Sequence, residues 1–166
     1  MARYGIAVCA LVISFAHSAC AHPHAWIDVK SRAVVDAQGN ITAIKEQWVF
    51  DEYYTEFVLQ DFAPKDRGAP SPDTLRQLAH TNLGNLKDYS YFTFAESAGV
   101  RAVFSEVREV ESHMEGKRIA MNFTLALAEP ANAKAHVFTY RIFDPSYYIE
   151  MLHGRKSDAA LEGEGA

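Results

Sequence analysis

The chain has 166 residues, of which 49% are hydrophobic and 22% charged, and its formal net charge at pH 7 is −5. That length suits one domain with a sizeable hydrophobic core. An acidic chain without basic runs argues against binding to nucleic acids or anionic membranes, and it is compatible with attraction of cations.

The first 21 residues have the three parts of a secretory signal peptide. Arg3 comes before an apolar run from Ile6 to Phe15, and small residues surround Cys20 where signal peptidase cleaves. The run is too short to span a membrane. We therefore predict that residues 1–21 are removed, that the protein is periplasmic, and that the mature chain begins at His22 without inserting directly into the membrane.

Both cysteines, Cys9 and Cys20, lie inside this signal. The mature chain therefore has no disulfide and no thiolate metal ligand. Acylation of Cys20 is the less favoured alternative, because His17 lies where a lipoprotein signal has an aliphatic residue. Of the seven histidines, all but His17 remain after cleavage.

Alternating side chains predict that residues 25–35 and 41–50 form strands, joined by a turn at 36–40. In an antiparallel hairpin with that turn, the numbers of paired residues add up to about 76 or 77. His24 then falls opposite Glu52 or Tyr53. The start of the first strand is therefore expected to lie beside the end of the second.

The rest of the chain predicts two helices and several further strands. Helical periodicity covers residues 51–62 and 72–87, and the second helix has Ser71 as its N-cap and Pro72 as its first residue. Strands are predicted over 91–96, 100–104, 107–113, 119–127, 135–143 and 147–152, with a loop at 129–134. Residues 153–166 lack apolar periodicity and are predicted to be a disordered tail.

These elements predict a single α+β domain over residues 22–152. Its core would be an antiparallel β-sheet or small sandwich, and the two helices would be inserted after the second strand.

The sequence His22-Pro23-His24 at the new N-terminus is the main candidate for metal binding. Imidazole nitrogens and a free α-amine suit zinc, nickel, cobalt and copper(II). Pro23 has no amide proton, which excludes the square-planar site that needs a deprotonated second amide. The hairpin brings Asp51 and Glu52 close, so we expect these four side chains to be the ligands: His22, His24, Asp51 and Glu52.

Each of these residues also has a simpler role open to it. The two histidines could belong to a solvated N-terminus, Asp51 could be a helix N-cap, and Glu52 could interact favourably with the helix dipole. Asp28 lies further along the first strand, so we expect it to support the site rather than bind the metal.

Four sequence segments together resemble one family of bacterial proteins. They are His22-Pro23-His24-Ala25-Trp26-Ile27-Asp28, Trp48-Val49-Phe50-Asp51-Glu52, Tyr91-Phe92-Thr93-Phe94 and Phe143-Asp144-Pro145-Ser146-Tyr147-Tyr148. The family comprises periplasmic proteins of unknown function labelled "ABC-type transport system, periplasmic component". Their genes commonly lie beside permeases of the nickel/cobalt type, and some pairs are linked to zinc acquisition. The resemblance implies an inner-membrane metal permease as partner.

The chain departs from that family in two places. Many members have an EF-hand-like loop between the helices, but Ala63–Gly68 lacks most of the acidic ligands, so calcium binding is not expected there. Members usually continue beyond the position of Ala166 through a segment that contains cysteine. The resemblance therefore implies that this sequence is truncated.

The sequence as a whole predicts a periplasmic divalent-metal-binding accessory component of a metal-ion transporter, with zinc the first choice and nickel or cobalt next. No enzyme is expected, since the chain has no Gly-x-Ser-x-Gly or His-Glu-x-x-His motif. Two alternatives stay open. One is a copper-binding protein or oxidase with an N-terminal histidine brace, and the other is a structural partner of the permease that binds no metal.

Overall fold

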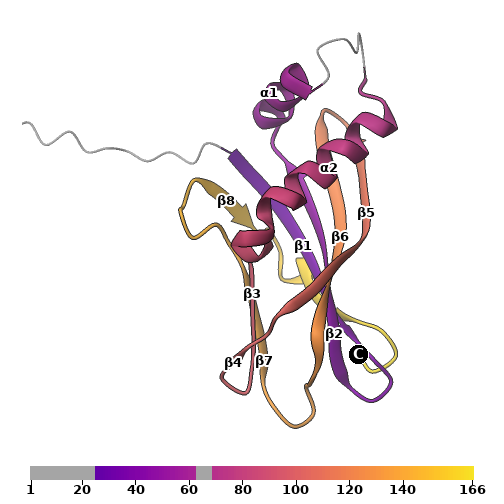
Figure 1. Ribbon diagram of the computed structural model, residues 1–166, viewed down its shortest axis with the longest axis vertical. Coiled ribbons are helices and arrows are strands. Elements are labelled where there is room, and N and C mark those ends of the chain that lie inside the picture. Colours follow the sequence, from indigo (N-terminus) through magenta and orange to yellow (C-terminus); the bar gives the residue numbers. More distant parts are fainter. Residues whose placement is uncertain (1–24, 63–68) are drawn as a thin grey trace, which may run out of the picture.

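A computed structural model describes residues 25–62 and 69–166, which form two β-sheets with helices on one face (Figure 1). The predicted α+β class is confirmed. The predicted signal peptide, His22, His24 and the Ala63–Gly68 loop lie outside the described residues.

The larger sheet has the order β5-β6-β2-β1, and both β8 and β9 pair with the remaining edge of β1. Its strands are β1 (Ala25–Val35), β2 (Asn40–Phe50), β5 (Phe104–Glu115), β6 (Arg118–Asn132), β8 (Ile149–Leu152) and β9 (Ala159–Glu162). The smaller sheet has the order β4-β3-β7. Its strands are β3 (Thr93–Ser97), β4 (Val100–Arg101) and β7 (Phe138–Ile142).

The β1–β2 hairpin has the predicted register. Ile27 pairs with Phe50 and Val34 pairs with Ala43, and the register then shifts by one residue at Val35. Alternate β1 side chains, beginning with Ala25, are buried, because this face of the sheet contacts the core. The end of β2 therefore lies beside the start of β1, as the hairpin arithmetic requires.

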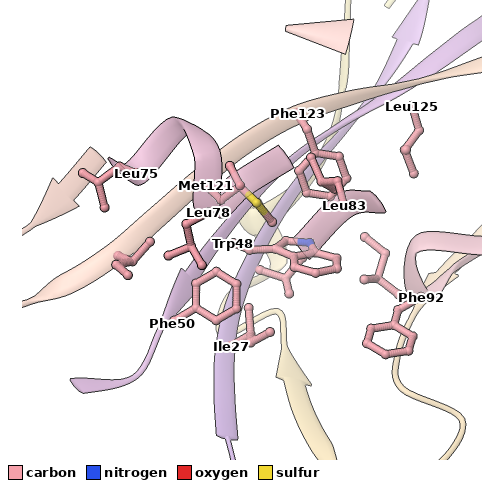
Figure 2. Close-up of a cluster of buried hydrophobic side chains, with 14 residues drawn as sticks. Ile27, Trp48, Phe50, Leu75, Leu78, Leu83, Phe92, Met121, Phe123 and Leu125 are labelled. Carbon is pink, nitrogen blue, oxygen red and sulfur yellow. The ribbon is translucent and has the colours of Figure 1, made fainter. Parts of the chain in front are cut away.

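Helix α2 (Pro72–Leu86) crosses one face of the larger sheet (Figure 1). It begins as predicted, because the Ser71 hydroxyl accepts a hydrogen bond of 3.1 Å from the Thr74 amide. Its apolar side chains lie over Trp48, which is 1% exposed (Figure 2). Each fully buried Leu stabilises the fold by roughly 1.5–3 kcal/mol. The other helices are α1 (Glu52–Phe62) and the 3₁₀ segments η1 (Lys87–Phe92) and η2 (Lys156–Asp158).

A second hydrophobic cluster joins the two sheets. Ile44 and Leu127 come from the larger sheet, and Ala95 comes from the smaller one. Phe138 and Tyr140 on β7 pack against this cluster. The smaller sheet therefore covers the part of the larger sheet that α2 leaves uncovered.

The strand directions and the strand limits differ from the sequence prediction. Strands β8 and β9 run parallel to β1, so the larger sheet is mixed rather than wholly antiparallel. Strand limits also shift: the predicted strand 100–104 divides between β4 and β5, and β6 continues through most of the predicted 129–134 loop.

The prediction of a disordered tail over residues 153–166 is wrong for this segment, which contains η2 and β9. All four side chains of β9 are exposed, and the strand is held by main-chain pairing with β1. Its sequence therefore needs no alternation of apolar and polar residues. Gly163 has φ +115°, and a Cβ there would lie 2.2 Å from the Val35 carbonyl oxygen. This glycine therefore permits close packing and does not signal disorder.

Glu46 is a charged residue type enclosed between the two sheets, with only 3% of its surface exposed. Its Oε2 accepts a hydrogen bond of 2.8 Å from Trp48 Nε1, and its Oε1 lies 2.7 Å from Thr93 Oγ1. Thr93 Oγ1 is also 3.0 Å from the Tyr91 carbonyl oxygen. One hydroxyl proton cannot serve both acceptors, so a protonated Glu46 that donates to Thr93 satisfies every group.

Burial raises the pKa of the Glu46 carboxyl from 4.5 to about 7, although the hydrogen bonds that Thr93 and Trp48 donate to its ionised form oppose this. The folded protein therefore binds this proton more tightly than the unfolded chain does. The resulting stability is fully present below about pH 4.5, decreases as the pH rises and is lost above about pH 7. The difference amounts to about 3 kcal/mol.

Glu46→Gln should remove most of this pH dependence, because an amide can donate to Thr93 and accept from Trp48 without ionising. Urea unfolding at pH 5 and pH 8 measures it, with the exposed Glu129→Gln as the control. We expect the unmodified protein and the control to lose stability between the two pH values, and Glu46→Gln to lose much less. The same loss in all three would contradict a protonated Glu46.

Candidate functional site

Asp51 lies where the β1–β2 ladder ends and α1 begins. Its Oδ2 accepts a hydrogen bond of 2.9 Å from the Trp26 amide, and its own amide donates to the Trp26 carbonyl at 3.0 Å. Its Oδ1 accepts from the Tyr54 amide at 2.9 Å. Asp51 is therefore the N-cap of α1 and also fixes the first residues of β1 to that helix.

These hydrogen bonds do not use the whole carboxylate. Each oxygen of an ionised carboxylate has two lone pairs, so both oxygens of Asp51 keep one acceptor position. Capping and metal ligation are thus chemically compatible at this residue. Glu52 is exposed in the first turn of α1, where its charge also favours the helix dipole.

Glu150 is a carboxylate at this site that the sequence pattern did not indicate. In the parallel pairing of β8 with β1, Glu150 lies opposite Trp26, and its Oε2 accepts a hydrogen bond of 3.1 Å from Trp26 Nε1. Asp144 fixes the start of β8, since it accepts from the amides of Tyr148 and Ile149. The predicted turn at Asp144 and the strand after it are local signals, but their parallel partner cannot be read from the sequence.

Asp28 has a structural partner, Arg118, which the sequence pattern did not indicate either. Arg118 Nη1 lies 2.8 Å from Asp28 Oδ2. The same guanidinium donates to the carbonyl oxygens of Phe50 at 2.7 Å and Val49 at 2.8 Å. Arg118 therefore holds the end of β2 against β1, and Asp28 neutralises its charge.

The described residues bring carboxylates to one end of the sheet without completing a metal site. Asp51 and Glu150 lie on either side of Trp26, and Glu52 follows Asp51 in α1. Within residues 25–62 and 69–166, no three His, Asp or Glu side chains are grouped closely enough to hold a metal ion. In the same ranges, no helix is both long and apolar enough to cross a membrane.

Comparison with known sequences shows the family. Residues 7–166 match the family described as "Protein of unknown function (DUF1007)". The chain belongs to this family. It is also 26% identical over 149 residues to a protein of Haemophilus influenzae named "Uncharacterized protein", an alignment that covers 89% of this chain and 69% of that protein. No solved structure matches the chain.

The two roles of Asp51 in the fold generate a stability prediction. Asp51→Ala removes the acceptors for the Trp26 and Tyr54 amides, so we expect a loss of about 1–2 kcal/mol. Asp51→Asn keeps an N-cap side chain and should lose less. Urea unfolding gives the values. The neighbouring exposed Glu52→Ala is the control and should change stability by no more than about 0.5 kcal/mol. Equal stability of Asp51→Ala and Glu52→Ala would show that Asp51 does not join these elements.

Proposed function

We propose that this protein is a periplasmic divalent-metal-binding accessory component of a metal-ion transporter, and that zinc is its preferred metal. The imidazoles of His22 and His24 bind the ion together with the carboxylate of Asp51 or Glu52. An inner-membrane permease receives or supplies the metal. The observation that carries this proposal is the pair of hydrogen bonds between Asp51 and the main chain of Trp26.

Chain length makes this observation informative about the two histidines. His24 is two residues before Trp26, so its Cα is at most about 7 Å away whatever the local conformation. His22 is four residues before Trp26 and is at most about 14 Å away. Chain length therefore permits both imidazoles to approach the carboxylate of Asp51.

The chemistry of the available side chains supports zinc over a hard cation. Two imidazoles with one or two carboxylates make a common zinc ligand set, whereas calcium takes six to eight oxygen ligands. Glu150 provides a further carboxylate beside Trp26 and is a candidate for the remaining position. The nearby Arg118 forms an ion pair with Asp28, so its positive charge is already balanced by a carboxylate.

The histidines provide the first test. Calorimetric titration with zinc should show saturable binding to the chain beginning at His22, and none to His22→Ala/His24→Ala. His80→Ala/His136→Ala is the matched control and should bind like the unmodified chain. The absence of saturable binding of zinc, nickel, cobalt or copper by the unmodified chain would contradict the proposal and favour a structural partner that binds no metal.

The carboxylates provide a second test, which separates ligation from capping. Asp51→Asn keeps a helix cap but removes the charge, and Glu52→Gln and Glu150→Gln remove one charge each. Replacing a ligand should weaken zinc binding by at least about tenfold, because even loss of a group that only orients a ligand costs 10–100-fold. Glu129→Gln changes the net charge equally at an exposed position near the end of β6, and should have little effect. If all four variants bind zinc equally, the ligand set is wrong.

One added glycine before His22 tests the copper alternative. The addition removes the free amine from the histidine, so a histidine brace should bind copper much more weakly. A site of imidazoles and carboxylates should keep its zinc affinity. Preferred copper binding that is lost on extension would replace the zinc proposal with the brace.

A further inference from the structure

The edge of β1 that faces away from β2 pairs with two separate strands. β8 pairs along Ala25–Asp28, and β9 pairs along Ser31–Val34. Residues 153–158 connect them. A cavity of about 710 Å³, wide open to solvent, lies beside this connection and the edge of β7, and its lining includes Tyr140, Arg141, His153, Arg155 and Lys156.

The cavity has a polar inner wall that the fold holds in place. The Ser31 hydroxyl is 2.9 Å from the Tyr140 hydroxyl and 3.0 Å from His153 Nε2. Ser31 itself is 1% exposed and belongs to a central strand. The phenol and the imidazole are thus positioned by a residue that has little freedom to move.

The rim of the cavity is positively charged. Arg141, Arg155 and Lys156 are all exposed, and none forms an ion pair with a carboxylate in the described parts of the chain. Asp158 is the acidic residue nearest in sequence to Arg155 and Lys156, and its Oδ2 accepts a hydrogen bond of 2.7 Å from the Arg155 amide. Three unpaired cations around one cavity are notable in a chain whose net charge is −5.

We propose that this cavity binds a small soluble oligoanion whose charged groups are phosphates or carboxylates. Guanidinium groups form paired hydrogen bonds with both kinds of group, and an ammonium group adds a point charge. The volume lies within the range of about 300–1,000 Å³ that is common for small-molecule sites. This site does not depend on the proposed metal site.

Calorimetric titration with inorganic pyrophosphate and, separately, with citrate tests the proposal. We expect saturable binding of at least one probe. Arg155→Gln/Lys156→Gln should weaken it about tenfold or more, since it removes two positively charged hydrogen-bond donors. Arg76→Gln/Lys87→Gln is the control on α2 and η1, because it changes the net charge equally and should weaken binding by no more than about twofold.

Two further arms distinguish direct anion binding from binding through a metal and from attachment to a lipid surface. His22→Ala/His24→Ala should bind the anion like the unmodified chain, and loss of binding there would mean that a bound metal holds the anion. Sedimentation with phosphatidylglycerol vesicles should recover no protein, and recovery without pyrophosphate or citrate binding would assign the cations to a lipid surface. Failure of both probes, or equal weakening in the two charge variants, would also overturn the proposal.

Discussion

The hydrogen bonds between Trp26 and Asp51 fix the register on which the rest of the structure depends. They close the β1–β2 ladder at the residue where α1 starts, so one carboxylate sets both the sheet and the direction of the chain leaving it. β1 then pairs with β8 and β9 on its other edge. A shift of one residue in β1 would turn its buried side chains toward solvent and move Trp26 away from Asp51 and Glu150.

The interior between the two sheets is apolar except around Ser31 and Glu46. Ser31 and Glu46 are direct partners on neighbouring strands, and both face the interior. Glu46 bonds to Thr93 of the smaller sheet, and Ser31 bonds to Tyr140 of the same sheet. Because unpaired polar groups are costly in the interior, these contacts align the two sheets, while Trp48 and its neighbours contribute most of the buried apolar area.

The sequence pattern predicted those features of the fold that depend on contacts between residues close together in the chain. The hairpin register, the α2 start at Ser71 and the N-cap position of Asp51 all follow from residues close together in the sequence. The parallel pairing of β8 and β9 did not, because each strand is four residues long and joins β1 from more than 100 positions away. Glu150 was missed for the same reason, since its place at the candidate site depends entirely on that pairing.

The two candidate sites have opposite charge and lie on one segment of the chain. Glu150, in β8, is five residues before Arg155, which places their Cα atoms at most about 17 Å apart. The Debye length at physiological ionic strength is about 8 Å. Attraction between a bound cation and a bound anion is therefore largely screened at full extension. β8 connects the two sites, since its register with β1 positions Glu150 and its end leads into His153.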